Sequence, residues 1–361
     1  MAKCQQNVKF EFEDLEEEMI FIDACLGKKT AYTPVWMMRQ AGRYLPQYRA
    51  VRQKAGDFLT LCKTPELACE VTLQPVEELG VDAAILFSDI LVVPEAMGLG
   101  LGFFEGEGPK FSSTIRDLSD LDTLNVARGV ENLGFVYDAV RQIRKNLDAS
   151  KALIGFCGAP WTLATYVIEG GSSRTYANSK KMLYQAPQLM HSILRKITNC
   201  LKIYLDEQIR AGADAVQIFD SWAGALEASA YSEFGLSYVV EICDFVKQNH
   251  PQTPIIFFAK DANFDAKQLL KLKADVLGVD WACRMSEAKA KFGEKFVLQG
   301  NLEPARLYSV DAIDEGVEEI LSVMQNRRHI FNLGHGILPD IPVANAQYFV
   351  KQVQSKSARF N

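Results

Sequence analysis

Eight short runs of apolar, strand-forming residues alternate with longer helical segments along this chain, and this alternation limits the possible folds more than any other feature. The runs are residues 34–38, 83–87, 153–156, 215–219, 255–258, 276–279, 296–298 and 330–333. Strands that alternate with helices form βαβ units around a parallel sheet. Eight successive units favour an α/β fold of the closed (β/α)8 TIM-barrel type over an open doubly wound sheet.

The segments between the runs carry helical signals. In residues 187–210, leucine or isoleucine recurs every fourth residue and Gly212 follows, which predicts an amphipathic helix packed on the strands. Thr64 and Pro65 predict the start of another helix, which Pro75 is expected to kink or end. The glycine-rich segment 98–109 is interpreted as a loop or hairpin insertion, because no helix opens directly from a strand there as in a nucleotide-binding loop.

Composition fits one large globular domain. Of the 361 residues, 48% are apolar and 23% are charged, and no linker rich in Gly, Ser or Pro divides the chain. We therefore expect an acidic N-terminal leader at residues 1–19 and a single barrel over residues 20–361. The net charge of −6 argues against a general binder of nucleic acid or anionic membranes. With neither a secretory signal nor an apolar run of about 18 residues, a soluble cytoplasmic protein is expected.

Eight cysteines are scattered along the chain without a Cys-x-x-Cys or His-x-Cys pair. Neither a disulfide scaffold nor a zinc site is expected from this spacing, and most of the cysteines are expected to be small buried residues.

Functional groups of barrel enzymes project from the carboxyl ends of the strands, so the residues that follow each run are the candidates. Arg39, Arg43, Arg49 and Arg52 follow the first run within fourteen residues. Guanidinium groups pair bidentately with carboxylates or phosphates, and each charged hydrogen bond contributes about 1.5–3 kcal/mol. This arginine segment, residues 39–52, predicts a polyanion-binding site at the mouth of the barrel.

Other strand ends are also polar. Asp89 follows the second run among apolar neighbours that penalise an unpaired carboxylate, so it needs cations or hydrogen-bond donors. His335 lies between two glycines, which allow a ligand or backbone to approach closely, although a structural histidine is equally compatible. Asp261, Asp280 and Asn301 are expected mainly to cap helices.

Five segments resemble motifs of the uroporphyrinogen decarboxylase family, in the same order. They are TPVWMMRQAGRYLP at 33–46, FSDILVVP at 87–94, GFCGAPWTL at 155–163, QGNL at 299–302 and NLGHGI at 332–337. The similarity spans about residues 20–353. It implies a (β/α)8 barrel that acts without cofactor or metal, commonly as a homodimer whose two clefts face each other.

The resemblance also implies a reaction and a site. Four acetate side chains of uroporphyrinogen would lose CO2 to become methyl groups, giving coproporphyrinogen in haem synthesis. The arginines would hold carboxylates, and Asp89 would stabilise positive charge on the pyrrole. The proton donor is open between Arg39, Tyr166 and a bound water. The implied site residues are Arg39, Arg43, Asp89, Tyr166, Ser221 and His335, with Arg52 and Phe87 close by.

Two alternatives remain at this point. Corrinoid- or thiol-dependent methyltransferases resemble this barrel family, but they usually need a zinc-binding His-x-Cys that the chain lacks. A carrier that binds porphyrin precursors without reacting is the other alternative. The presence of Asp89, Tyr166 and Ser221 together argues against it, since simple anion binding has no need of a lone carboxylate among the cations.

Overall fold

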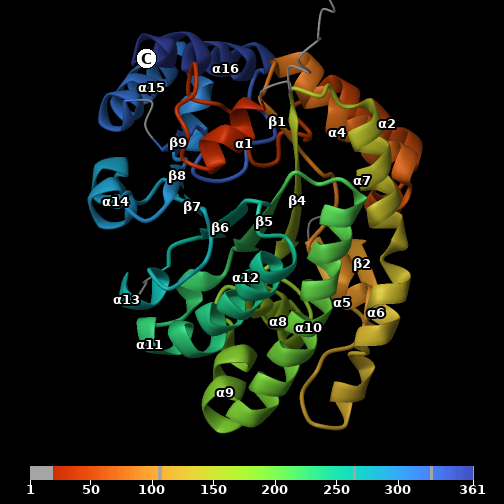
Figure 1. Ribbon diagram of the computed structural model, residues 1–361. Coiled ribbons are helices and arrows are strands. Elements are labelled where there is room, and N and C mark those ends of the chain that lie inside the picture. The colour runs from red at the N-terminus through yellow and green to blue at the C-terminus, as the bar shows by residue number, and fades with distance from the viewer. Residues whose placement is uncertain (1–18, 105–107, 263–265, 326–327, 361) are drawn as a thin grey trace, which may run out of the picture.

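The computed structural model describes residues 19–104, 108–262, 266–325 and 328–360. Strands lie in the middle of the molecule and helices lie around them, as Figure 1 shows. Of the expected acidic leader, residues 1–18 lie outside the described residues.

Within the described residues, seven parallel strands form one sheet in the order β1-β4-β5-β6-β7-β8-β9. Their bounds are β1 Ala83–Ile85, β4 Ala152–Gly158, β5 Ala215–Asp220, β6 Ile255–Ala259, β7 Val276–Gly278, β8 Val297–Gln299 and β9 His329–Ile330. These strands confirm seven of the eight expected runs.

The remaining run, residues 34–38, is the first in the sequence and was wrongly expected to be a strand. It forms a single parallel bridge from Val35 to Phe331, just beyond β9. On its other side, the Asp82 N–H donates to the Val35 carbonyl at 2.9 Å, and the Asp82 carboxylate accepts the Val35 N–H at 2.9 Å. Residue 35 therefore joins the two ends of the sheet and closes the barrel, as expected for the TIM-barrel class.

Helices connect the strands and cover the outside of the sheet (Figure 1). Those before β5 are α1 Ile20–Cys25, α2 Pro46–Ala55, α3 Phe58–Lys63, α4 Pro65–Leu79, α5 Val92–Ala96, η1 Asp120–Thr123, α6 Val126–Asn132, α7 Gly134–Asn146, α8 Pro160–Glu169, α9 Ala177–Gln185 and α10 Pro187–Ala211. Those after β5 are η2 Ala223–Ala225, α11 Ala228–Tyr231, η3 Ser232–Leu236, α12 Ser237–Asn249, α13 Ala266–Leu269, α14 Met285–Phe292, η4 Pro304–Tyr308, α15 Val310–Met324, α16 Val343–Ser357 and η5 Ala358–Phe360.

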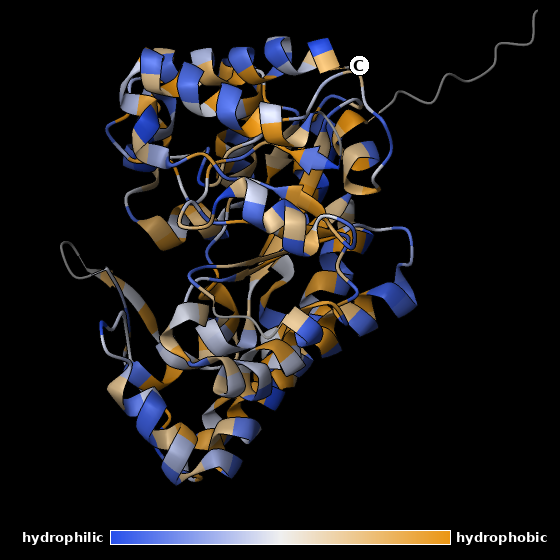
Figure 2. Ribbon diagram, turned by 90° about the vertical axis from the view of Figure 1, so that its left-hand side faces the viewer, coloured by the Kyte–Doolittle hydropathy of each residue, from blue (hydrophilic) through white to orange (hydrophobic). Residues whose placement is uncertain are grey.

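The core lies between the strands and the inner faces of these helices. Figure 2 shows hydrophobic strands in the interior and helices with hydrophilic outer faces. Helix α10 has the predicted apolar stripe: Leu189, Ile193, Ile197, Leu201 and Leu205 are all buried. It ends where predicted, with Gly212 in the left-handed conformation that favours glycine.

Two other local predictions have mixed outcomes. Helix α4 starts at Pro65 after Thr64, as expected, but the Thr64 hydroxyl donates to the Thr60 carbonyl instead of capping the helix. The helix also continues past Pro75 to Leu79, so of the two expected effects of this proline, a kink or an end, the structure excludes the end. The glycine-rich segment forms an antiparallel hairpin, β2 Leu101–Phe104 and β3 Gly108–Phe111, as predicted.

The cysteines of the described part are free, and all but Cys283 are buried, which confirms that most are small core residues. No helix in the part of the chain that the structure describes is long and apolar enough to cross a membrane.

Candidate active site

Arg39 leaves the barrel at the carboxyl end of the first segment with a φ of 60°, which is uncommon for a residue other than glycine. The backbone before it is fixed by the chain after β9. The Met38 N–H donates to Asn332 Oδ1 at 3.0 Å, and the Ile337 N–H donates to the Met38 carbonyl at 3.0 Å. The Arg39 side chain is exposed at this point. Its guanidinium is therefore presented to solvent from a firmly held backbone.

The rest of the arginine segment is mostly helical, since α2 begins at Pro46. Arg43 is exposed before the helix, and Arg52 is half-buried on it. Arg49 has a different role, because its Nη1 donates to the carbonyls of Arg43 (2.7 Å) and Tyr44 (3.2 Å). Arg49 therefore stabilises the turn, while the guanidinium groups of the other arginines remain candidates for binding an anion.

Asp89 follows β1 in a short loop before α5. Its Oδ1 accepts the Leu91 N–H at 2.8 Å, and its carbonyl accepts the Val92 N–H at 3.3 Å. The side chain is half-buried, and loss of hydration raises the pKa of the carboxyl, while the Leu91 N–H and the charge of Arg39 oppose this rise. The Leu91 N–H is thus a hydrogen-bond donor of the kind expected from the sequence, and Arg39 acts on the carboxylate through its charge.

Phe87 belongs to an aromatic wall beside the arginine segment. Its ring centroid lies 5.6 Å from that of Tyr48 and 5.9 Å from that of Phe58, and Phe58 lies 4.7 Å from Phe103 on the hairpin. Burial raises the pKa of Tyr48, whereas Arg52 and Arg43 lower it, which shows that both cations act at this wall. The sequence did not indicate Phe58 or Phe103, because neither follows a barrel strand.

Tyr166 lies on α8 and not directly at a strand end. It packs against Trp222, with ring centroids 6.0 Å apart, and Trp222 packs against Tyr176 at 5.4 Å. Burial raises the pKa of the Tyr166 phenol; the negative charge of Asp89 raises it further, and Arg39 lowers it. Arg39, Asp89 and Tyr166 are thus close enough to influence one another electrostatically.

Ser221 is half-buried directly after β5 and is held by its neighbours. The buried Asp220 carboxylate accepts the Thr162 hydroxyl at 2.6 Å and the Tyr231 hydroxyl at 2.8 Å. Thr162 Oγ1 in turn accepts the Trp222 N–H at 3.1 Å. Burial raises the pKa of Asp220 to about 6, although the hydrogen bonds from the two hydroxyl groups lower it. This network fixes the backbone on both sides of Ser221.

His335 lies between the rings of Phe258 and Trp281, at centroid distances of 6.2 and 5.9 Å. The flanking glycines allow close approach, as predicted. A Cβ at Gly334 would lie 2.3 Å from the backbone nitrogen of Trp281, and a Cβ at Gly336 would lie 2.4 Å from Cδ of Arg39. The loop after β9 therefore packs tightly on two other strand ends.

Burial lowers the pKa of His335 to about 4, with further lowering by Arg39 and Lys260 and an opposing contribution from Asp261. The imidazole is thus neutral at neutral pH. At that pH, His335 is suited to hydrogen bonding and not to charge pairing.

The polar residues expected to cap helices instead join loops. Asp280 accepts the N–H groups of Asp261 (2.7 Å) and Ala282 (2.8 Å), and Asn301 donates to the carbonyls of Asp280 (2.8 Å) and Cys283 (2.6 Å). For Asp280 and Asn301 the helix-cap expectation was wrong, because Arg284 occupies the N-cap position of α14 and Glu303 that of η4.

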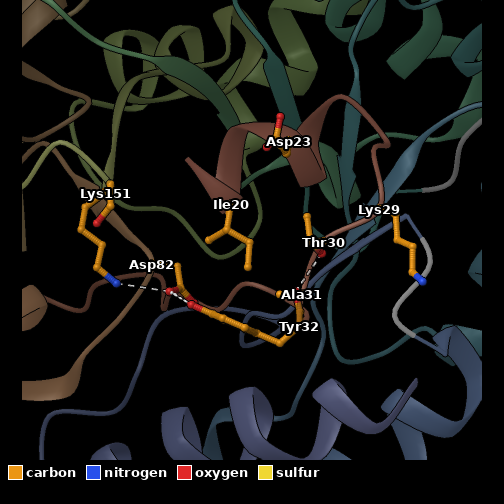
Figure 3. A pocket seen from close by; sticks show the side chains of 9 residues that line it. Ile20, Asp23, Lys29, Thr30, Ala31, Tyr32, Asp82 and Lys151 are labelled. Carbon is orange, nitrogen blue, oxygen red and sulfur yellow. Dashed lines mark hydrogen bonds and ion pairs between the residues drawn. The ribbon is translucent and has the colours of Figure 1, made fainter. Parts of the chain in front are cut away.

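A pocket of about 270 Å³ lies away from this site (Figure 3). Asp82 and Lys151 line it and directly precede β1 and β4, so it opens at the amino-terminal end of the barrel. Tyr32 donates to Asp82 at 2.8 Å, and the ammonium of Lys151 lies 3.3 Å from the same carboxylate. These bonds stabilise barrel closure, and the chemistry belongs at the opposite end.

Among the described residues, no group of three or more His, Cys, Asp and Glu side chains is placed to hold a metal ion.

The fold and the site define a (β/α)8-barrel enzyme whose mouth combines arginines with the half-buried carboxylate of Asp89. The family model described as uroporphyrinogen decarboxylase (URO-D) matches residues 17–356. The chain belongs to the uroporphyrinogen decarboxylase family.

Curated relatives support this membership along almost the whole chain. The chain is 62% identical to a uroporphyrinogen decarboxylase of Campylobacter fetus over 342 residues, covering 95% of this chain and 99% of the relative. It is 56% identical to one from Campylobacter jejuni over 350 residues, covering 94% and 100%.

Solved structures share the fold at low identity. A methyltransferase from Methanosarcina mazei superposes with a TM-score of 0.78 at 20% identity, covering 94% of this chain and 98% of that one. A B12-independent methionine synthase from a Shewanella species gives a TM-score of 0.54 at 10% identity, covering 92% and 98%. At these identities the likeness concerns the fold alone.

Proposed function

We propose that this carboxy-lyase converts the four acetate side chains of uroporphyrinogen to methyl groups, giving coproporphyrinogen and CO2 in tetrapyrrole synthesis. The observation that carries the proposal is the placement of Arg39, Asp89 and Tyr166 around one part of the barrel mouth: Arg39 follows the segment that closes the barrel, Asp89 follows β1, and Tyr166 lies on α8 after the adjacent β4. A polycarboxylate held by arginines beside a fixed carboxylate such as Asp89 is the arrangement that this reaction needs.

The arginine segment binds the carboxylates of the substrate. The chain carries a net charge of −6, so cations must be concentrated where a substrate with eight carboxylate groups binds. Arg39, Arg43 and Arg52 supply them beside the aromatic wall of Phe87, which offers an apolar face to the pyrrole rings. Tyr166, Ser221 and the neutral His335 bind further carboxylates by hydrogen bonds.

Asp89 stabilises the cationic form of the reacting ring. Protonation of a pyrrole carbon gives an iminium-like ring; the bond from the acetate methylene to its carboxylate then breaks, and the electron pair enters the ring as CO2 leaves. The methylene carbon takes up one proton, and the ring carbon loses the proton it gained. A carboxylate fixed by the Leu91 N–H is preorganised to accept the pyrrole N–H and to oppose the developing charge. The reaction in this form uses no cofactor and no metal.

Tyr166 acts in this scheme as a neutral hydrogen-bond donor. Burial and the negative charge of Asp89 raise the pKa of its phenol, so the hydroxyl keeps its proton at neutral pH. A neutral phenol can donate to a substrate carboxylate without adding a second anion beside Asp89.

The proposed working form is a cytoplasmic homodimer that needs neither nucleic acid nor a membrane, with residues 20–361 as one barrel domain. The family resemblance supports two clefts that face each other, and Trp281, 41% exposed at the barrel mouth, offers apolar surface on that face. Light scattering after size exclusion should give twice the 40.3 kDa of one chain. A monomer at micromolar concentration would contradict the dimer.

Product analysis tests the function directly. The purified chain, dialysed against a chelator, is incubated anaerobically with chemically reduced uroporphyrin III, and the oxidised products are separated by number of carboxylates. Conversion from eight to four carboxylates is expected, with release of CO2. Intact octacarboxylate that stays bound would indicate a carrier, and activity only after metal is restored would indicate metal-dependent chemistry.

A further inference from the structure

Lys260 is a cation at the barrel mouth that the function proposed above leaves unused. It directly follows β6, and its backbone is fixed on one side by the chain after β5. The Lys260 N–H donates to the Asp220 carbonyl at 3.0 Å, and the Gly224 N–H donates to the Lys260 carbonyl at 3.1 Å. On the other side, the Asp261 N–H donates to the Asp280 carboxylate. The side chain therefore starts from a rigid base.

The Lys260 ammonium lies near Trp281, a residue that His335 also contacts. Its Nζ lies 5.5 Å from the ring centroid of Trp281, whose own ring contacts His335. His335 contacts the same Trp281 ring as Lys260, and the next residue, Gly336, packs against the Arg39 side chain. In the order of the barrel, segment 34–38 is the first position and β6 is the fifth, so Arg39 and Lys260 start from opposite sides of the mouth.

The present partner of Lys260 is replaceable. Its ammonium pairs with the Asp261 carboxylate, whose side chain is 51% exposed. Ion pairs with an exposed partner contribute little, because water solvates the separated charges well. A substrate carboxylate can therefore displace Asp261 at small cost, and the ammonium then remains paired.

We propose that Lys260 binds a propionate carboxylate on a pyrrole ring that is not reacting, on the side of the mouth opposite Arg39. The inference rests on the proposed function, and the chemistry of the substrate selects the propionate. The reacting ring lies at Asp89, so the ring across the mouth presents its side chains to Lys260. Acetates disappear one by one over four turnovers, whereas every ring keeps its propionate throughout. A subsite that works in all four turnovers must therefore recognise propionate.

Four variants test this assignment. Lys260→Gln removes the charge, Lys260→Arg keeps it, and Asp261→Asn removes the competing carboxylate. Lys145→Gln is the matched control, because Lys145 is exposed in the last turn of α7 and gives the same change in net charge at the other end of the barrel. Each variant is first compared with the parent by thermal unfolding, so that loss of fold is detected.

The expected result is a KM for uroporphyrinogen about tenfold higher in Lys260→Gln, with kcat changed less than about twofold, since a charged hydrogen bond to a non-reacting group contributes to uniform binding. Calorimetric titration with coproporphyrinogen under anaerobic conditions should show the same loss, because the product keeps its propionates. Lys260→Arg should recover most of the affinity, and Asp261→Asn should bind more tightly than the parent.

Several results would overturn the inference. An unchanged KM in Lys260→Gln, or an equal rise in Lys145→Gln, removes the subsite. A rise in KM without weaker coproporphyrinogen binding contradicts the propionate assignment. A parent chain that does not decarboxylate uroporphyrinogen contradicts the proposed function instead, and the calorimetric comparison then still decides whether Lys260 binds propionate.

Discussion

Gly336 packs against the side chain of Arg39, so closely that a Cβ at Gly336 would lie 2.4 Å from Cδ and 2.8 Å from Cγ of the arginine. The chain after β9 therefore sets the position of the guanidinium that begins the arginine segment. The contact links the last strand of the barrel to the first segment at the height of the site.

Gly336→Ala is expected to displace Arg39 without changing any charge. We expect kcat/KM for uroporphyrinogen to fall at least about tenfold, because a positioned guanidinium is lost, with little change in the unfolding midpoint. Gly134→Ala is the matched control, since a Cβ there meets no atom within 4 Å. Equal kcat/KM in both variants would show that the contact does not position Arg39.

Arg39→Gln is expected to move the acid limb of the pH profile. Asp89 must be ionised to stabilise a cationic ring, so kcat/KM falls as the pH drops through the pKa of Asp89. Burial raises that pKa and the charge of Arg39 lowers it, so removal of Arg39 raises it further. The acid limb should therefore shift to higher pH, in addition to a loss of affinity. Arg49→Gln is the control. An unshifted acid limb in Arg39→Gln would show that the charge of Arg39 does not act on Asp89.

The arginines should divide into two groups by salt dependence. Arg43→Ala and Arg52→Ala are each expected to raise KM about tenfold and to flatten its dependence on ionic strength, because a substrate contact between charges is removed. Arg49→Ala should lower the free energy of unfolding by about 1 kcal/mol through loss of its carbonyl bonds, and should keep the parent salt dependence. If KM depended on ionic strength equally in the parent and in all three variants, substrate binding by Arg43 and Arg52 would be contradicted.

Asp220→Asn should change the pH dependence of stability. The folded-state pKa of Asp220 is about 6, above its ordinary value of 3.8, so the folded chain binds a proton more tightly than the unfolded chain. Stability that the proton provides is present at low pH and is lost as the pH rises through about 4 to 6. This loss amounts to about 3 kcal/mol.

Urea unfolding at several pH values measures this effect as a difference between parent and variant. The variant should lose less free energy of unfolding than the parent between pH 4 and pH 7. Parallel curves would show that the buried carboxylate does not titrate in this range.

The fold was largely predictable because seven strands coincide with short, mainly apolar runs. Segment 34–38 was not predicted correctly, because hydrogen bonds to side chains largely replace the backbone pairing of a strand there. The N–H groups of Val35, Met37 and Met38 donate to Asp82, Gln40 and Asn332, respectively. Two of these acceptors, Asp82 and Asn332, are distant in sequence from their donors, and a local pattern does not contain such bonds.

Asp89, Ser221 and His335 could be chosen as candidates from the sequence because each follows a strand, and their roles stay predictions. Trp222 and Tyr176 were missed because only the folding of α8 brings Tyr166 against them. Lys260 also follows a strand, but no local feature separated it from a surface lysine. Its contact with Trp281 appears only in three dimensions.

The central claim is that the arginines position the substrate and Asp89 stabilises the reacting ring. Asp89→Asn tests it most directly when single-turnover decarboxylation and substrate affinity are measured on the same preparation. The surface substitution Asp138→Asn serves as the control. We expect affinity within about threefold of the parent and a rate at least about a hundredfold lower, as for loss of a preorganised electrostatic group. A variant that binds uroporphyrinogen and decarboxylates it at near the parent rate would contradict the claim.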